Sequence, residues 1–533
     1  MALRCPHAAA CAFLVALGNA AATPNVLLLM ADQHRFDALG PNAHTPHLDS
    51  LASDGARFLR HYSSTPSCTP ARAALLTGLS PWRHGMLGYG EIAPTYPREL
   101  AQSLDALGVS TAVIGKNHFG WEKASGRPVA HGFEFLRIYD GLGNGFSNTT
   151  AYDDYDRWFQ TQRPGESPLK SGGLGWNDWA GTPYEYDEYL HPTAWTGRLA
   201  ARTLQELGRR GKPFFLKVSF HRPHSPYDPP IRLLNATPPL ARAPAKSKDG
   251  WDDEYRHCPT SGEHDTCCGE VHAGDLDLTR RAYFASVAHV DEQIGKILKV
   301  LRDIGVMNNT FIIYTSDHGD MRMDHFLWRK TFPYEGSSHI PLLFWWPPSL
   351  DIKLGERRGR SIEAVTEIRD IFPTILDLLG HWNKADEDYF DGRPLTKLLQ
   401  NNMVTSWRSW IDMEHNVYCG PWNHWSALTD GKIKFVFHAH NGKKMLFDLV
   451  NDPDETQDLA HDPRWTPVVH LWRDRMVHQF EAEGRGSQWV SDGRLVRRAP
   501  INYSPHYPGP RLHVSGPHDI YSHEPAALYS VVV

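Results

Sequence analysis

A cysteine followed by a cation is the first feature of this sequence that could do chemistry. Cys68 lies just ahead of Pro70 and four residues before Arg72, and an apolar stretch then ends at Thr77 and Gly78. Such a cysteine is either a reaction centre or a buried thiol near the start of a helix, since free cysteines often pack as small apolar side chains. The residues that accompany it decide between the two interpretations.

Two pairs of metal-ligand types follow apolar segments. Asp32 and Gln33 come directly after an apolar run near the start of the chain, and Asp317 and His318 come just after Thr310–Thr315. Carboxylates at adjacent strand ends repel each other unless a cation lies between them, and hard oxygen ligands favour Ca²⁺ or Mg²⁺. An Asp at a strand end can equally cap a helix, so either pair alone leaves both interpretations open.

Lysine and histidine side chains occupy three more places of this kind. Lys116 and His118 follow Ser110–Ile114 and point to the same side if the chain stays extended. His224 lies in a loop that its prolines hold rigid, and Lys330 comes shortly after the Asp–His pair. Taken singly, each is better explained as an exposed cation or a hydrogen-bonded core histidine than as a catalytic group. Their joint occurrence reverses that preference.

Apolar runs and helical patterns alternate over most of the chain. Strands that alternate with helices predict an α/β fold with a mainly parallel central sheet flanked by helices. Ligands bind at the carboxyl ends of strands in such sheets, so the polar clusters should open onto one rim. The predicted strands are Asn25–Met30, Ser110–Ile114, Phe214–Phe220 and Thr310–Thr315, and the predicted helices are Thr45–Asp54, Ala71–Leu76, Leu100–Leu107, Ala194–Leu207 and Ala282–Leu301.

The pattern changes in the second half of the chain. Residues 242–275 are expected to form an inserted polar loop, and Glu363–Leu379 a helix interrupted by Pro373. Past residue 400, a turn at Asp430 and Gly431 indicates antiparallel strands. We expect these strands within Ala427–His438 and Lys444–Leu449, followed by a helix over Pro467–Gly484 and an extended tail.

The N-terminus has the composition of a secretory leader. One positive charge, a short apolar stretch and the small residues at 18–22 describe a signal peptide. We expect the signal peptide over 1–22, a catalytic domain over 23–400 and a smaller C-terminal α+β subdomain over 401–533. Passage through the secretory pathway leads to an extracellular, lysosome-like or periplasm-like compartment. Four sequons are glycosylation candidates: Asn148, Asn235, Asn308 and Asn502.

Composition narrows the class of protein. The chain has 533 residues, of which 41% are hydrophobic and 22% charged, and this fits a soluble globular enzyme larger than one ordinary core. The net charge of −6 and the absence of a long basic run give no reason to propose a nucleic-acid partner. No segment after the leader is apolar for long enough to predict a membrane span.

Four cysteines remain for a structural role once the leader and Cys68 are set aside. Cys258, Cys267, Cys268 and Cys419 allow at most two disulfides, with three ways to connect them. The close group of Cys258, His264, Cys267 and Cys268 could instead hold zinc, although its spacing matches no standard finger. A loop pinned by disulfides is the favoured interpretation.

Together these motifs resemble those of the sulfatase family in the alkaline-phosphatase superfamily. The cysteine motif, C-x-P-x-R-x4-T-G, is similar to the family signature in which the cysteine becomes formylglycine. The resemblance runs from Asn25 to about Leu449. The further motifs that carry it are Met30–Gln33, Gly115–His118, Pro223–Pro226, Ser316–Asp320, Trp328–Lys330, Tyr334–Gly336, Asp370–Thr374 and Leu446–Pro453.

The resemblance implies a nucleophile and a metal ion. Cys68 would be the formylglycine precursor, made by a formylglycine-generating enzyme or its equivalent, and the aldehyde hydrate would attack the sulfate ester. One divalent ion, Ca²⁺ in preference to Mg²⁺, would neutralise the developing charge. Its ligands would be the modified Cys68 with Asp32, Gln33, Asp317 and His318. Many members of the family carry Asp in place of Gln33 and Asn in place of His318, so the identity of the ion is less certain than its presence.

The resemblance also assigns the surrounding cations. Arg72 and Lys116 would orient and polarise the hydrate, and His118 would assist release of sulfate. His224 and Lys330 would hold the sulfate oxygens, and one of them would protonate the leaving alcohol. The implied activity is hydrolysis of a sulfate monoester, whose alcohol is a glycan, an aryl group or a small alkyl group. Trp-rich segments at 82–84, 173–179 and 423–425 either line the rim or, as we slightly prefer, pack the subdomain.

Two rival functions share the same residues. A phosphodiesterase or phosphonate monoester hydrolase of the same superfamily would use the same metal and cations, and some of those enzymes also carry formylglycine. A secreted binding protein that has lost catalysis is the other rival. Every expected site position is filled in this sequence, which argues against an inactive protein.

Overall fold

The computed structural model describes residues 23–40, 43–121, 127–141, 153–169, 173–258, 266–356, 358–400, 407–416, 418–420 and 422–509. The expected signal peptide and Asn148 lie outside these residues. Asn235 and Asn308 are exposed and Asn502 is half-buried, and their glycosylation stays a prediction. None of the helices in the described ranges is long and apolar enough to cross a membrane.

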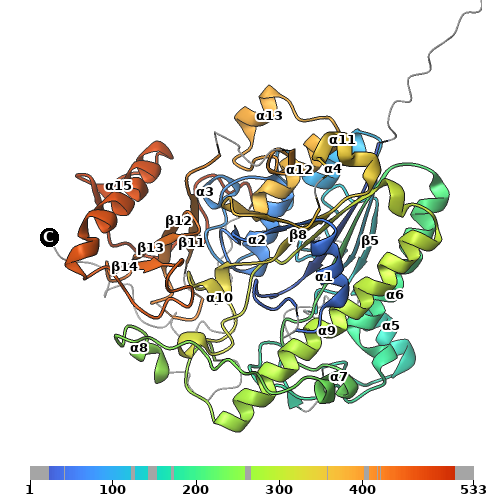
Figure 1. The fold of residues 1–533 in the computed structure, drawn as a ribbon, viewed down its shortest axis with the longest axis horizontal. Coiled ribbons are helices and arrows are strands. Elements are labelled where there is room, and N and C mark those ends of the chain that lie inside the picture. The colour runs from blue at the N-terminus through green and yellow to red at the C-terminus, as the bar shows by residue number, and fades with distance from the viewer. Residues whose placement is uncertain are drawn as a thin grey trace, which may run out of the picture.

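An eight-stranded sheet forms the centre of the molecule (Figure 1). Within the described residues, β8 alone runs antiparallel to its neighbours, so the mainly parallel sheet predicted from the sequence is confirmed. The strands, in their order across the sheet, are β5 Phe135–Ile138, β4 Ser110–Gly115, β6 Phe214–Phe220, β1 Asn25–Ala31, β7 Thr310–Thr315, β8 Leu342–Trp345, β2 Ala56–Phe58 and β9 Arg360–Ile362.

The four strands predicted from the sequence, β4, β6, β1 and β7, are neighbours in the middle of this sheet. All their residues are buried, because helices cover both faces of a parallel sheet and leave its strands apolar throughout. Leu27 and Leu29 of β1 pack on one face against α1, α6 and α9, and Val26 and Leu28 pack on the other against α2, α4 and α12. These helices span α1 Pro46–Ser53, α2 Cys68–Thr77, α4 Leu100–Ala106, α6 Pro192–Arg210, α9 Ala273–Asp303 and α12 Ile371–Leu378.

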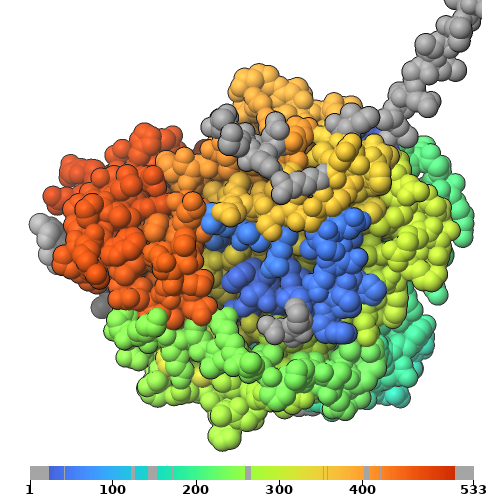
Figure 2. Space-filling view, viewed as in Figure 1, coloured from blue at the N-terminus to red at the C-terminus, as the bar shows by residue number. Residues whose placement is uncertain are grey.

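A smaller antiparallel sheet lies beside the central one (Figure 1). Helix α15 covers one of its faces, and Trp328 and Tyr334 of the catalytic part pack against the other. Figure 2 shows these C-terminal residues as a lobe against the rest of the chain. The elements are β11 Ile411–His415, β12 Trp425–Thr429, β13 Ile433–His438, β14 Lys444–Asp448 and α15 Thr466–Ala482, close to the strands and helix predicted there.

One predicted helix is wrong at its start. Residues Thr366–Glu367 form β10, which pairs in parallel with β3 (His61–Tyr62), and helix α12 begins only at Ile371 after a single 3₁₀ turn. Pro373 therefore lies in the first turn of a helix, where a missing N–H costs nothing. The other elements are α3 Pro81–His84, α5 Asp154–Gln162, α7 Ile231–Ala236, α8 Asp253–Arg256, α10 Glu335–Ser338, α11 Asp351–Leu354, α13 Lys384–Tyr389, α14 Thr396–Gln400, β15 Val490–Ser491 and β16 Arg494–Leu495.

The four remaining cysteines form two disulfides. Cys258 pairs with Cys268, and Cys267 pairs with Cys419. The expectation of a disulfide-pinned loop is confirmed for these cysteines, and they leave no thiolate for zinc; His264 lies outside the described residues. The second bridge ties the inserted segment to the C-terminal lobe across 152 residues of sequence.

Candidate active site

Helix α2 presents Cys68 at its first residue. Ser67 has an extended backbone with φ −154° and starts the helix, and Gly78 ends it with φ 68°. A side chain at Gly78 would be strained at this φ, and its Cβ would also come within 2.6 Å of the Phe390 ring. The N-terminus of a helix carries partial positive charge. The buried thiol of Cys68 therefore lies where negative charge is stabilised.

Two lysines and a histidine surround the sulfur atom. Lys330 Nζ lies 3.0 Å from Cys68 Sγ, His318 Nε2 lies 3.2 Å away and Lys116 Nζ 3.8 Å away. Burial and the charge of Asp32 oppose ionisation, but these three cations outweigh them and lower the pKa of the Cys68 thiol. The centre is built to hold an oxygen or sulfur anion at this point.

Arg72 joins the two aspartates. Its Nη2 atom lies 3.1 Å from Asp32 Oδ2 and 2.8 Å from Asp317 Oδ2, and Nη1 donates to the carbonyl of Lys116. All three charged side chains are fully buried. A buried charge is tolerated only when it is paired and hydrogen-bonded, so this guanidinium fixes two strand ends and α2 in one arrangement.

The two acidic strand ends, the cysteine and a histidine form a compact donor set. Asp32, Cys68, Asp317 and His318 each offer an atom, and these atoms lie within 4.8 Å of one another. His318 Nδ1 donates to the carbonyl of Gly319 at 3.0 Å. This contact directs Nε2 toward the cluster, 3.2 Å from Cys68 Sγ, where a bound cation would take the place of the Nε2 proton. These side chains can hold a divalent cation.

Gln33 is next to this donor set, since its backbone N–H donates to Asp317 Oδ1 at 3.2 Å. Its Nε2 donates to Asp320 Oδ2 at 2.7 Å and to the Tyr227 hydroxyl, whereas Oε1 is buried and has no partner among the described residues. Its backbone adopts φ 69°, an unfavourable conformation for a residue with a side chain that clusters at functional sites. An unsatisfied buried oxygen calls for a ligand, and a cation would satisfy it.

Lys330 and His224 form a hydrogen-bonded pair. Lys330 Nζ lies 2.9 Å from His224 Nε2, and His224 Nδ1 donates to the carbonyl of Ser225. Nε2 is therefore the acceptor and Lys330 the donor. Burial, together with the charges of Lys116 and Lys330, holds the pKa of His224 well below its usual value. The proton in the hydrogen bond between the two side chains therefore stays on Lys330, and the imidazole is neutral.

His118 completes the predicted group. It is buried, and neither ring nitrogen has a partner among the described residues. Its backbone N–H, like that of Asn117, donates to Asp140 Oδ1, which holds the loop after β4 in place. Burial, then the charges of Lys116 and Arg72, keep the pKa of His118 well below its ordinary value. A neutral imidazole here can accept a proton.

The structure thus brings every predicted catalytic and metal-ligating residue to one buried centre at the carboxyl ends of β1, β4, β6 and β7. Sequence reasoning gave no role to the residues that hold them, namely Ser219, Tyr227, Asp140 and Asp320. In the Trp-rich segment at 173–179, for which packing was preferred, the ring of Trp176 instead lies at the centre, 5.7 Å from Lys116 Nζ and 5.6 Å from the His224 ring. In the other two Trp-rich segments, Trp82 and Trp425 are packed in cores, as preferred. For Asp320, the available signal was its place at the end of the Ser316–Asp320 motif.

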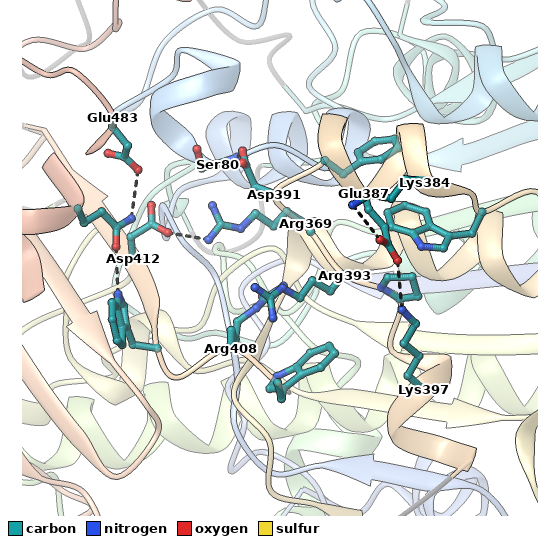
Figure 3. Close-up of a pocket in the computed structure, with 17 residues that line it drawn as sticks. Ser80, Arg369, Lys384, Glu387, Asp391, Arg393, Lys397, Arg408, Asp412 and Glu483 are labelled. Atoms are coloured by element: carbon teal, nitrogen blue, oxygen red, sulfur yellow. Dashed lines mark hydrogen bonds and ion pairs between the residues drawn. The ribbon is translucent and has the colours of Figure 1, made fainter. Parts of the chain in front are cut away.

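A separate cavity of about 580 Å³ lies elsewhere, between the catalytic part and the C-terminal lobe (Figure 3). Ser80 lines it, so it reaches the carboxyl end of α2, whereas Cys68 begins that helix. A ten-residue helix is roughly 15 Å long. This cavity is distinct from the centre at Cys68.

Comparison with known proteins identifies the family. The family model for sulfatases matches residues 24–381. The chain belongs to the sulfatase family. This sulfatase is also 33% identical over 503 residues to the arylsulfatase of Clostridium perfringens, which spans 91% of this chain and 99% of that protein. It is therefore a hydrolase of the sulfatase class in the alkaline-phosphatase superfamily.

A further relative, a second family model and a solved structure are also similar to this chain. The sulfatase is 29% identical to the choline-sulfatase of Rhizobium meliloti, over 88% of this chain and 90% of that one. A second family model, N-sulphoglucosamine sulphohydrolase C-terminal, matches residues 323–482. The crystal structure of the phosphonate monoester hydrolase of Agrobacterium radiobacter superposes with a TM-score of 0.68 at 24% identity, covering 90% of this chain and 100% of that chain. That likeness concerns the fold alone.

Proposed function

We propose that this sulfatase cleaves sulfate monoesters with a formylglycine derived from Cys68 and one divalent cation, Ca²⁺ in preference to Mg²⁺. The observation that carries the proposal is the buried charge pattern at Cys68 Sγ. Two lysines approach the sulfur within 3.8 Å, and Asp32, Asp317 and His318 form the candidate cation site together with Cys68. A sulfate monoester has one negative charge, and more charge develops on its oxygens as the ester bond breaks.

The cation would be held by Asp32, Gln33, Asp317 and His318 beside the modified Cys68. Gln33 Oε1, which has no partner among the described residues, and the orientation of His318 Nε2 toward the cluster support this donor set. Oxygen donors with a single imidazole suit a hard cation. When bound, the ion would supply charge neutralisation and lower the pKa of a nearby hydroxyl.

The nucleophile would be the hydrate of the formylglycine at position 68. Arg72 fixes the carboxylates around it, and Lys116, which pairs with Asp32 Oδ2 at 2.7 Å, holds positive charge next to the attacking oxygen. Lys330 and His224 would grip the sulfate oxygens, in the manner of an oxyanion hole. The ester S–O bond then breaks as the hydrate oxygen attacks sulfur.

Proton transfer would be divided between two sides of the centre. The leaving alcohol oxygen needs a proton, and the Lys330–His224 pair holds one between Nζ and Nε2. His118, whose ring nitrogens have no partner among the described residues and whose pKa is lowered, would take a proton from the remaining hydroxyl, so that sulfate is expelled and the aldehyde is restored. Water therefore need not attack sulfur.

We also propose that aromatic side chains bind the alcohol part of the ester. The half-buried ring of Trp176 lies over Lys116, and Gly141 leaves it room, because a Cβ there would come within 1.5 Å of the indole. The rings of Tyr89 and Tyr418, which are also half-buried, contact each other edge to face, and their centroids lie 5.6 Å apart. The partner would be a sulfated small molecule or glycan, handled along a secretory route to an extracellular, lysosome-like or periplasm-like compartment.

The proposal is tested at Cys68 itself. Oxidation of the thiol to the aldehyde lowers the mass of the peptide by about 18 Da, which follows from the change of the side chain. Purified protein should show this mass at position 68 and hydrolyse 4-nitrophenyl sulfate, and Cys68→Ala should fold but not turn over. Hydrolysis that survives in Cys68→Ala would overturn the mechanism.

A phosphodiesterase or phosphonate monoester hydrolase remains the second candidate function, since the fold of such an enzyme superposes on this chain. The same cations suit phosphate oxygens. Values of kcat/KM for an aryl sulfate, an aryl phosphate diester and an aryl phosphonate monoester, measured on one preparation, separate the two. The sulfate should be preferred, and a clear preference for either phosphorus ester would make the second function correct.

A further inference from the structure

The cavity between the catalytic part and the C-terminal lobe has the composition of a binding site (Figure 3). Its volume of about 580 Å³ falls within the range of sites for small ligands. The walls come from five segments, namely Ser80 before α3, the 3₁₀ turn before α12, the segment of α13 and α14, the chain around the start of β11, and the end of α15. None of these segments contributes to the centre at Cys68.

Aromatic and cationic groups meet in this cavity. Three tryptophans line it, and the guanidinium groups of Arg369, Arg393 and Arg408 lie in its middle (Figure 3). Arg408 stacks over the Trp407 ring at 5.3 Å and Arg393 over the same ring at 6.0 Å. The tryptophans are Trp382, Trp407 and Trp410.

The arginines are not equivalent. Arg369 pairs with Glu367 and Asp412, and Arg408 pairs with Glu367 and Asp370. The Arg393 guanidinium, in contrast, forms no ion pair or hydrogen bond with any residue in the described ranges. Arg393 is exposed. Partial burial and the charges of Arg408 and Arg369 lower its pKa, while the carboxylates of Asp370 and Glu367 act in the opposite sense. An anion can therefore reach this guanidinium from solvent and pair with it.

Two buried polar atoms in the same wall also lack partners. Asp412 is 6% exposed, and its Oδ2 accepts no hydrogen bond from a described residue, although Oδ1 binds Arg369. The Nε1 atom of Trp382 is likewise buried and unpaired within the described chain. Each such atom costs stability unless a ligand or water satisfies it. One acceptor and one donor therefore await hydroxyl groups.

Glu483 adds a carboxyl group to the wall. Its Oε1 accepts from Gln479 Nε2 and its Oε2 pairs with Arg485 Nε, while burial raises its pKa to about 7. Lys384 and Lys397 share Glu387. The cavity therefore offers flat aromatic faces, hydrogen-bonding groups and the Arg393 guanidinium.

We propose that this cavity is a second binding site of the sulfatase, and that it takes a saccharide carrying a sulfate or a carboxylate group. The anionic group would pair with Arg393, hydroxyls would meet Asp412 and Trp382, and a sugar ring would lie against tryptophan. Rings with C–H faces and polar edges fit tryptophan in this way, whereas an apolar ligand would leave the polar atoms unsatisfied. The site holds a glycan apart from the reaction and goes beyond the function proposed for Cys68.

The test measures binding with the reaction centre disabled. Calorimetric titrations use the full chain carrying Lys330→Ala, with three tetrasaccharides: a sulfated heparin fragment, tetragalacturonate and neutral cellotetraose. The two anionic sugars should bind, and cellotetraose should bind about tenfold more weakly, the loss expected for one charge-assisted contact. The comparison of the sulfated with the carboxylated sugar shows which anionic group the site prefers.

Substitution then locates the site. Arg393→Ala, added to Lys330→Ala, should weaken binding of the anionic sugars by roughly tenfold, and Arg393→Lys should restore part of it. Arg157→Ala, which removes a surface arginine paired with Asp154, is the matched control and should change nothing. In otherwise unsubstituted protein, Arg393→Ala should leave the hydrolysis of 4-nitrophenyl sulfate unchanged, which separates this site from the failure or success of the proposed reaction.

Several results would overturn the proposal. Equal affinities for Arg393→Ala and Arg157→Ala, or equal affinities for the neutral and anionic sugars, would do so, and so would tighter binding of an acidic tetrapeptide. Hydrogen exchange on the unsubstituted protein provides a readout that does not depend on folding of a variant. Heparin tetrasaccharide should protect amides in 382–400 and 407–412, and protection confined to residues around Cys68 would refute a second site.

Discussion

At the scale of single residues, the candidate active site depends on charges that are held apart from water. Lys116, Lys330 and Arg72 are buried around one sulfur atom, and each would be costly without the aspartates and the nucleophile that face it. The same low dielectric that makes them costly strengthens their attraction for a developing anion. The buried cations reduce folding stability, but they are already in position around the reaction centre before the substrate binds.

Replacing Lys330 should therefore reduce turnover far more than replacing an exposed lysine. Lys330→Ala removes the ammonium that lies 3.0 Å from Cys68 Sγ, and it leaves His224 without its proton donor. We expect kcat/KM for 4-nitrophenyl sulfate to fall roughly a hundredfold or more, with changes in both kcat and KM. Lys246→Ala, at an exposed lysine, serves as control, and initial rates that match this control would remove Lys330 from the reaction.

Trp176 should affect the choice of alcohol. Trp176→Ala removes the half-buried ring over Lys116, and aromatic contacts of this kind contribute roughly 1 kcal/mol each. We expect kcat/KM for 4-nitrophenyl sulfate to fall about fivefold, mainly through KM, and to fall less for ethyl sulfate. Trp176→Phe should keep most of the preference, and Tyr189→Ala, at an exposed ring, should not alter it. Equal losses on both esters would show that the ring does not contact the alcohol.

At the scale of elements, the strands were predictable and their partners were not. β1, β4, β6 and β7 follow from fully buried apolar runs, and the residues after them follow from the rule that sites lie at carboxyl ends. The start of the predicted helix at Glu363 failed because Thr366–Glu367 instead pairs with His61–Tyr62, some 300 residues earlier. Local pattern carries no information on such a contact. The same holds for the Cys267–Cys419 bridge and for the packing of Trp176.

One ion-pair network joins the two lobes. Arg369, in the turn before α12, lies 2.6 Å from Asp412 Oδ1 on β11 (Figure 3). It also pairs with Glu367. All three groups are buried, so removing one of them leaves the charge of its partner uncompensated. The orientation of the C-terminal lobe therefore depends on a contact between elements, not on the strength of either element alone.

Arg369→Ala should accordingly destabilise the protein by about 3–5 kcal/mol, measured by chemical denaturation at pH 7. The double variant Arg369→Met, Asp412→Leu removes both charges and should recover part of the loss, since apolar replacements need no solvation. Arg83→Ala, which breaks the more exposed pair with Asp391, should cost less than about 1 kcal/mol. If Arg369→Ala is no worse than Arg83→Ala, the network does not couple the lobes.

At the scale of the whole molecule, buried ionisable groups set how stability depends on pH. Burial lowers the pKa of His84 to about 3, of His438 to about 3 and of His424 to about 2. Such histidines fold as neutral rings, so the stability they contribute is present above pH 6.5 and is lost as pH falls toward their folded pKa. Glu367 acts in the opposite sense, because burial raises its pKa to about 7. Its contribution is present below pH 4.5 and is lost as pH rises through 7.

Because these contributions oppose each other, the informative quantity is the difference between variants. His84 is fully buried, and its Nδ1 accepts from the Met86 N–H, a contact that Asn can retain. Between pH 7 and pH 5, the contribution of the neutral His84 ring to the free energy of unfolding should fall by about 2 kcal/mol. The free energy of unfolding of His84→Asn should therefore fall by about 2 kcal/mol less than that of the unsubstituted protein over this interval.

His470→Asn, at an exposed histidine, is the matched control. Urea titrations at the two pH values measure the difference, and parallel losses in His84→Asn and the unsubstituted protein would show that His84 is already protonated in the folded state.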